Sequence, residues 1–271
     1  MKRNTCLLVW TGAFLLSVLF RTAEMLKFTE YDTGFIIPSY KTLTTVFSAV
    51  IFLFIAFSAL FISKSTRTNA CRKGFNALTS LSAFMLGAAL AVSAIADNYV
   101  GVPSVLRILC TALAVLSAVY FIAFALRSWV HFPFSAYFSA VPALFFVARA
   151  ASVAIKGAYH TVISDTVFDV AAYCFIMLFF LEFVRAANGS AQSGGAVKFA
   201  AMGTSASLLS LTASTPKIII SVLSPEALHD GSKSEYLLFF VGIYIACEVF
   251  SRLCFKQETS EKLSLYYSGK H

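Results

Sequence analysis

Charged residues are scarce in this sequence, and their scarcity excludes most soluble proteins. They make up 13% of the 271 residues, whereas 59% of the residues are hydrophobic and the mean hydropathy is +0.80. A typical soluble domain has about 25% charged and about 45–50% apolar residues. The composition therefore indicates an integral membrane protein.

Motifs for metal, nucleotide and nucleic acid chemistry are also absent. No H-E-x-x-H motif places two imidazoles on one helical face, and the cysteines lack the close pairing of a zinc site. No G-x-x-x-x-G-K-[ST] loop could hold phosphates, and no basic stripe alternates with aromatic residues on a polar domain. We therefore expect no metal, no cofactor, no nucleic acid partner and no enzymatic activity.

Long apolar runs fill most of the chain instead. Crossing a hydrocarbon core of about 30 Å takes about 20 apolar residues as a helix, which satisfies its own backbone groups. The strands of a membrane barrel would give much shorter, alternating segments. The sequence thus predicts an all-α, polytopic transmembrane helix bundle of about eight helices. The expected spans are residues 6–26, 43–63, 75–95, 105–126, 134–155, 166–185, 199–222 and 236–255.

The first span has a second interpretation. Lys2 and Arg3 before an apolar stretch are also typical of a signal peptide. Cleavage after Ala23 would put Arg21 where a small residue is required, so we predict a retained helix. Cleavage would leave seven helices.

Basic residues in short loops predict the orientation. Lys64, Arg67, Arg72 and Lys73 lie between the second and third spans, and such loops remain on the cytoplasmic side. Both termini are then cytoplasmic, as are 13 of the 21 basic residues. We therefore predict a multi-pass protein of the cell membrane, surrounded by the lipid bilayer, with residues 256–271 as a short cytoplasmic tail.

The spans leave no room for a separate soluble domain, so we predict one transmembrane domain over residues 1–271. Arg21-Thr-Ala23 in the first span has a counterpart in the fifth, Arg149-Ala-Ala151. A repeat of four helices, over about residues 1–130 and 131–256, would explain this match. Helices of equal length would also produce similar registers by chance, and both explanations stay open.

Ionisable residues inside the spans are the strongest functional signal, because each costs about 3 kcal/mol at a helix centre. Three arginines and two carboxylates are expected in the outer part of the membrane: Arg21, Glu24, Arg107, Arg149 and Asp169. Arginine presents a planar fork that suits a carboxylate or a phosphate, and the acidic residues could neutralise it when no ligand is bound. We predict that these five residues form a pocket for a small anion. Alternatively, Arg21 and Arg107 extend along the lipid to the phosphate headgroups.

A second charged layer is expected near the cytoplasmic side. Glu182 with Arg185, and Glu248 with Arg252, have spacings of three and four residues, which put each pair on one helical face. Such pairs either fasten helices together or form an inner gate or proton relay.

Small and hydroxyl-bearing residues predict close helix packing. Thr204, Ser207, Ser210 and Ser214 recur at helical spacing in the seventh span, and Gly87 with Ala91 forms a small-xxx-small pattern in the third.

The segment from Arg21 through Asp32-Thr33-Gly34-Phe35 resembles a pattern in uncharacterised multi-pass bacterial membrane proteins. In those proteins an Arg near the end of the first helix precedes an Asp-x-x-Gly-Phe or Thr-Gly-Phe element. The resemblance implies a bacterial cytoplasmic membrane and the same general architecture, and it implies no reaction.

Two function classes are compatible with these patterns. The protein either binds or transports a small, anionic solute through the outer charged pocket, or it serves as a membrane sensor or accessory scaffold subunit without transport activity. The second class requires a membrane protein partner, whereas the first requires a polar site inside the bundle.

Overall fold

The computed structural model describes residues 3–28, 36–71, 77–96, 103–126, 136–159, 163–187, 194–223 and 235–255. These residues form eight α-helices, one short 3-10 helix (η1, Pro38–Tyr40) and two short strands. The helices are α1 (Arg3–Lys27), α2 (Lys41–Ser65), α3 (Ala77–Ala96), α4 (Ser104–Ala125), α5 (Ala136–Tyr159), α6 (Ile163–Ala187), α7 (Gly195–Leu223) and α8 (Glu235–Arg252). The strands are β1 (Thr66–Cys71) and β2 (Leu253–Phe255).

The predicted class of fold is confirmed. Each predicted span corresponds to one of these helices with ends that differ by a few residues, and seven helices in the described ranges, α1 to α7, are long and apolar enough to cross a membrane. The remaining helix, α8, is short and contains Glu235, Glu248 and Arg252. That α8 also spans the membrane stays a prediction.

Large apolar side chains cover the outside of the bundle. Leu8, Leu53, Ile95 and Val105 are between 69% and 89% exposed in the isolated chain. Exposed apolar surface of this extent is unusual in a water-soluble monomer and suits contact with lipid tails.

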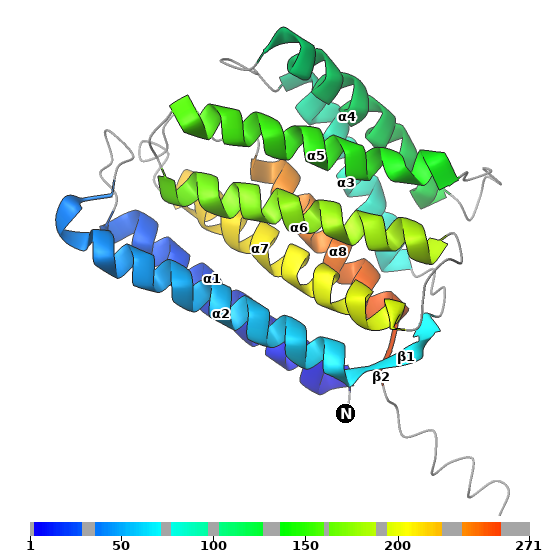
Figure 1. Ribbon diagram of the computed structural model, residues 1–271, viewed down its shortest axis with the longest axis horizontal. Coiled ribbons are helices and arrows are strands. Elements are labelled where there is room, and N and C mark those ends of the chain that lie inside the picture. Colours follow the sequence, from blue (N-terminus) through cyan, green and yellow to red (C-terminus); the bar gives the residue numbers. More distant parts are fainter. Residues whose placement is uncertain are drawn as a thin grey trace, which may run out of the picture.

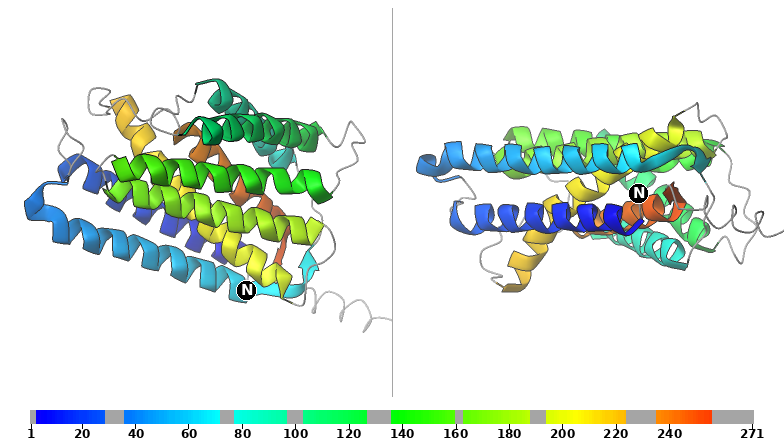
Figure 2. Two further views of the ribbon diagram at one scale, coloured as in Figure 1. Left: turned by 45° about the horizontal axis from the view of Figure 1, so that its top comes forward. Right: turned by 90° about the horizontal axis from the view of Figure 1, so that it is seen from below.

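Helix α7 occupies the centre of one half of the bundle. It packs against α1, α2, α6 and α8, and it runs obliquely between them (Figures 1 and 2). In the other half of the bundle α3 packs on α4 and α8, and α5 packs between α4 and α6. Because α7 has helices around it, its Ser and Thr side chains from Thr204 to Ser214 are buried in protein rather than exposed to lipid.

One hydrogen bond sets the register of α1 against α7. Trp10 Nε1 donates to Ser207 Oγ over 3.1 Å, and the Trp10 ring also lies edge-on to Phe250 of α8. Helix α1 is therefore anchored in the bundle through α7, α8 and its neighbour α2.

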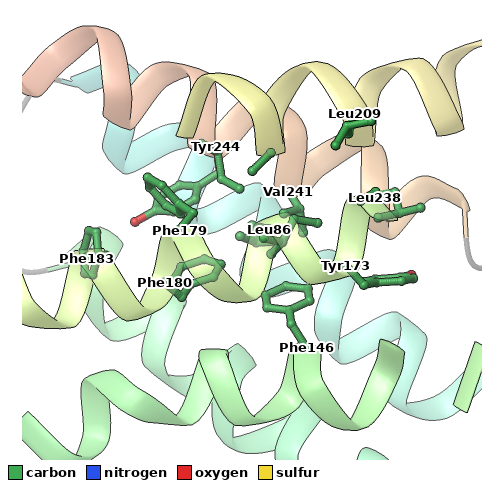
Figure 3. Packing of buried hydrophobic residues seen from close by; sticks show 14 of the residues in the cluster. Leu86, Phe146, Tyr173, Phe179, Phe180, Phe183, Leu209, Leu238, Val241 and Tyr244 are labelled. Atoms are coloured by element: carbon green, nitrogen blue, oxygen red, sulfur yellow. The ribbon is translucent and has the colours of Figure 1, made fainter. Parts of the chain in front are cut away.

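Aromatic rings fill the core between α4, α5, α6 and α8. Phe180 stacks on Phe146 and on Tyr244, with ring centroids 5.4 and 6.3 Å apart (Figure 3). Phe121 of α4 meets the rings of Phe180 and Tyr244 edge-on. Ring pairs of this geometry add about 0.5–1.5 kcal/mol each beyond the area they bury.

Glycine permits the predicted close contact between α3 and α4. A methyl group built at Gly87 would lie 2.8 Å from Ile122 Cγ1 and 3.2 Å from the Ala118 carbonyl oxygen. Only glycine fits at this distance, which supports the small-residue pattern noted in the sequence.

The two strands join the ends of α2 and α8. They pair antiparallel, with Thr66 opposite Phe255 and Cys71 opposite Leu253, and a bulge between. We call the end of the bundle that carries this ribbon the proximal end, and the opposite end the distal end. The start of α1 also lies at the proximal end (Figure 1). This agrees with the predicted topology, in which the loop after the second span lies on the same side of the membrane as both termini. Which side faces the cytoplasm stays a prediction.

Candidate functional site

Three ionisable residues, of which Arg21 and Lys217 are buried and Asp169 is partly buried, lie at a common depth near the distal end. Arg21 of α1, Asp169 of α6 and Lys217 of α7 are equally many residues from the distal ends of their helices. At a rise of 1.5 Å per residue, each lies about 9 Å inside its helix end. In the predicted topology this is the outer part of the membrane.

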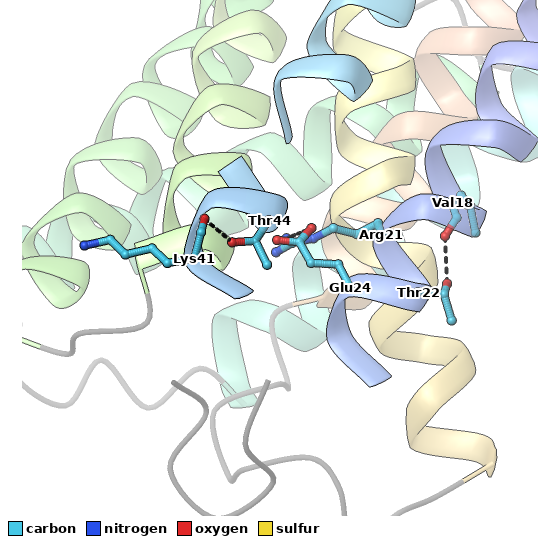
Figure 4. Close-up of polar contacts among 6 residues, drawn as sticks. All are labelled: Val18, Arg21, Thr22, Glu24, Lys41 and Thr44. Atoms are coloured by element: carbon cyan, nitrogen blue, oxygen red, sulfur yellow. Dashed lines mark hydrogen bonds and ion pairs between the residues drawn. The ribbon is translucent and has the colours of Figure 1, made fainter. Parts of the chain in front are cut away.

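Arg21 is buried inside the protein. Its exposed fraction is 2%, and its Nη1 donates to Glu24 Oε2 over 2.7 Å. Both side chains point from α1 toward the start of α2, where Thr44 lies, whereas Lys41 points away (Figure 4). The alternative that Arg21 extends along the lipid is therefore wrong, because its guanidinium has a carboxylate partner within the bundle.

The Arg21 guanidinium also contacts α6. Its Cζ lies 4.6 Å from the centre of the Phe168 ring, which itself stacks on Phe52 of α2 at 5.0 Å. A cation over an aromatic face is stabilised by about 2 kcal/mol when both are desolvated. Phe168 precedes Asp169 in the sequence, so this contact connects the Arg21–Glu24 pair to the turn of α6 that carries Asp169.

Lys217 pairs with Asp169 across the interface between α7 and α6. Its Nζ lies 3.2 Å from Oδ2 and 3.4 Å from Oδ1, and the lysine side chain is 7% exposed. We define the distal charge cluster as Arg21, Glu24, Asp169 and Lys217. It contains two cations and two carboxylates in matched pairs.

Lys217 was not predicted from the sequence as a site residue. The sequence does contain a signal, because Lys217 is an ionisable residue within the predicted span 199–222. The sequence could not predict whether the Lys217 side chain points into the bundle. Lys217 lies near the end of the span, and a lysine there can also extend to the lipid headgroups.

Arg149 lies deeper, on α5. It is 3% exposed, and its carbonyl oxygen accepts a hydrogen bond from Ser152 Oγ over 2.8 Å. Its distance from the end of α5 is about 15 Å by helical rise. Because α5 packs against α6, Arg149 is a buried cation on the helix next to Asp169.

Arg107 is separate from these residues. It lies in the first turns of α4, and its side chain is exposed. Helix α4 packs on α3 and α5 rather than on α1 or α7. The structure therefore supports the alternative that Arg107 extends toward the headgroups, and it gives no support to Arg107 as a ligand-binding group.

Both predicted pairs of the cytoplasmic layer form, at the proximal end. Arg185 Nη1 lies 2.6 Å from Glu182 Oε1, with Arg185 62% exposed, and Arg252 pairs with the buried Glu248. Arg252 also lies over the rings of Phe183 and Phe199, at 4.5 and 5.8 Å. The second pair thus connects α8 to α6 and α7, whereas the first lies at the surface of α6.

The four hydroxyl-bearing residues of α7 named in the packing prediction, Thr204, Ser207, Ser210 and Ser214, are buried. Ser207 and Ser214 donate to carbonyl oxygens one turn earlier in the same helix, over 3.1 and 2.7 Å. Within the described ranges Thr212 Oγ1 has no hydrogen-bond partner although the residue is fully buried. In the same ranges no three His, Cys, Asp or Glu side chains gather as metal ligands would.

No family of known sequences, no curated protein and no solved structure matches this chain. Residues 29–35 of the segment that resembles bacterial membrane proteins lie outside the described residues. The class of protein therefore follows from the fold and the site: a multi-pass helical membrane protein with one buried and one partly buried charged pair at its distal end.

Proposed function

We propose that the protein binds a small anionic solute at the distal charge cluster and carries it across the membrane. The observation that carries this proposal is the burial of Arg21 and Lys217 at one depth within a bundle of membrane-spanning helices, with the buried Glu24 bonded to Arg21. Buried charges in such a bundle are energetically unfavourable, so their presence is by default a sign of function. A purely structural role needs fewer of them, because apolar side chains of similar volume stabilise as well or better.

The charge balance favours an anion. The distal charge cluster pairs each cation with a carboxylate, and Arg149 adds a further positive charge on the neighbouring helix. An incoming carboxylate or phosphate would replace Glu24 or Asp169 as the partner of a cation. Arginine and lysine both bind such groups, arginine through two parallel hydrogen bonds.

The construction of α7 favours transport. Pro216 immediately precedes Lys217 within this helix. A proline in a helix removes one backbone hydrogen bond and permits a bend, and interrupted helices are frequent at the binding sites of transporters. A bend at Pro216 would move Lys217 relative to Asp169.

A membrane sensor is the second candidate. Helix α7 carries Lys217 near its distal end and contacts β1 at its proximal end. A shift of α7 on ligand binding would therefore reach the β1–β2 ribbon, where a partner protein could respond to it.

The proposal is tested by anion binding to the purified protein in lipid nanodiscs. Acetate, succinate, gluconate and inorganic phosphate are the probes, with binding measured by calorimetry and by the shift in unfolding temperature. We expect at least one of them to bind, Arg149→Ala and Lys217→Met to weaken it by about tenfold or more, and Arg149→Lys to restore only part. The matched control is Arg185→Ala, which removes an exposed cation at the proximal end.

Two outcomes would overturn the proposal: no binding of any probe by the wild-type protein, or equal binding by Arg149→Ala and Lys217→Met. Uptake of the bound anion into sealed proteoliposomes separates the two candidates. A transporter accumulates the labelled anion, whereas a sensor binds it without uptake.

A further inference from the structure

A fully buried hydroxyl group lies on α1, one helical turn from Arg21. Ser17 is 0% exposed, and its Oγ has no hydrogen-bond partner among the residues that the structure describes. Other buried serines of the bundle, such as Ser58 of α2 and Ser214 of α7, donate to a carbonyl oxygen one turn earlier in their own helix. A buried hydroxyl without a partner is unfavourable. Ser17 therefore offers a donor and an acceptor that the described protein groups do not use.

The register between α1 and α7 determines what Ser17 faces. Both helices run from the proximal to the distal end (Figure 1), and Trp10 of α1 donates a hydrogen bond to Ser207 of α7. Ser17 and Ser214 each lie seven residues after these two contact residues, which is close to two full helical turns. Each serine therefore points in nearly the same direction as the contact residue before it. The register puts Ser17 opposite Ser214 in the α1–α7 interface, and we call these two residues the hydroxyl pair.

The hydroxyl pair adjoins the distal charge cluster on its proximal side. The cations of α1 and α7, Arg21 and Lys217, follow the serines of their own helices by four and three residues. At these spacings a serine and a cation share one helical face, and the hydroxyl lies about 4.5–6 Å deeper. On the proximal side of the hydroxyl pair α1 becomes aromatic, because Phe14 stacks on Trp10 at 5.7 Å. Charged, hydroxyl and aromatic groups thus follow one another along α1 from the distal end inward.

We propose that the anionic solute is hydroxylated: its carboxylate or phosphate binds at the distal charge cluster, and a hydroxyl group a few bonds away binds the hydroxyl pair. This inference rests on the proposed function and names the chemical class of the substrate. Ser17 can donate one hydrogen bond and accept another, whereas Ser214 donates to the Ser210 carbonyl oxygen and can only accept. A solute hydroxyl also has a donor and acceptors, so it satisfies both serines. A methylene group in its place leaves Ser17 without a partner, and the site discriminates against it.

Matched pairs of solutes test this preference in the wild-type protein, without any variant. The affinities of 4-hydroxybutyrate and butyrate, and of glycerol 1-phosphate and propyl phosphate, are measured by calorimetry in nanodiscs. The members of a pair carry the same charged group and differ in hydroxyl groups. We expect the hydroxylated member of at least one pair to bind about tenfold or more tightly than its counterpart. Absence of this preference in both pairs would overturn the inference, and anion binding would stand if the anions named above bind. Failure of all these solutes to bind would overturn the proposed function itself.

The substitution Ser17→Ala tests which residue recognises the solute hydroxyl. It should reduce the preference to less than about threefold, by weakening the hydroxylated solute while the affinity for its counterpart stays as in the wild type. The matched control is Ser117→Ala on α4, which removes another fully buried hydroxyl that has no partner in the described ranges, and it should keep the preference. A Ser17→Ala protein that keeps the wild-type preference, or that binds both members of a pair equally more weakly, would overturn the inference.

Discussion

At the scale of single residues, burial decides what each charge contributes. Arg21 and Glu24 are both about 2% exposed, whereas Arg185 of the Glu182–Arg185 pair is 62% exposed. A buried pair cannot lose one partner without stranding the other in a medium of low dielectric. An exposed pair at the membrane surface is screened by water and salt, and contributes about 0–1 kcal/mol.

Glu24→Ala should therefore destabilise the protein strongly. It leaves the Arg21 guanidinium buried without its carboxylate, and the expected loss of unfolding free energy is about 3 kcal/mol or more. The measurement is unfolding in mixed detergent, followed by circular dichroism. The control Arg185→Ala should change the unfolding free energy by less than about 1 kcal/mol.

The double substitution Arg21→Met with Glu24→Met distinguishes the pair from unrelated effects. It removes both charges and keeps apolar volume, so it should recover much of the loss caused by Glu24→Ala. Equal losses in the single and the double variants would contradict the account of a stranded cation.

At the scale of helices, small residues decide how closely α7 approaches its neighbours. A methyl group at Gly203 would collide with Val249 Cγ2 of α8 and would lie 3.0 Å from the Phe179 ring of α6. Valine is stiff about its first side-chain torsion, and the ring is fixed among other aromatic residues, so neither group can move away at low cost. The central position of α7 therefore depends on glycine at 203.

Gly203→Ala should destabilise the bundle by about 1–3 kcal/mol through overpacking. The matched control is Gly12→Ala in α1, where nothing lies within 4 Å of the added methyl group. That substitution should be neutral or stabilising by up to about 1 kcal/mol, because alanine is the better helix former. Both are measured by detergent unfolding, and a neutral Gly203→Ala would show that α7 and α8 are farther apart than described.

At the scale of the whole molecule, the two ends of the bundle differ in chemistry. The proximal end carries the ribbon and the Glu182–Arg185 and Glu248–Arg252 pairs, whereas the distal charge cluster lies at the other end. The basic residues in the loop after α2 predict that the proximal end is cytoplasmic. The distal charge cluster would then face the outside of the cell.

Cysteine labelling in intact cells tests this orientation. In a cysteine-free background, Gly34→Cys should react with a membrane-impermeant thiol reagent, and Asn69→Cys, in β1, should react only after the cells are opened. Labelling of position 69 in intact cells would reverse the orientation and put the distal charge cluster inside.

The fold class and the helix positions could be predicted because lipid imposes them locally. Each backbone group in the membrane must be paired within its own segment, so an apolar run of sufficient length becomes a helix whatever its neighbours are. The i,i+3 and i,i+4 spacing of Glu182–Arg185 and Glu248–Arg252 is equally local, and both pairs form. The β1–β2 ribbon was not predicted, because it joins segments from opposite halves of the chain.

The sequence by itself determined that the chain is a bundle of membrane-spanning helices with charges at two depths. Only the tertiary structure decided which charges meet: Lys217 with Asp169, Arg21 over Phe168, and Arg107 at the surface. The depth of a charged residue follows from counting residues along its own helix. The partner of that residue depends on the rotation of each helix about its axis. A helix turns by about 100° per residue, so that rotation is set by packing against its neighbours and not by its own span.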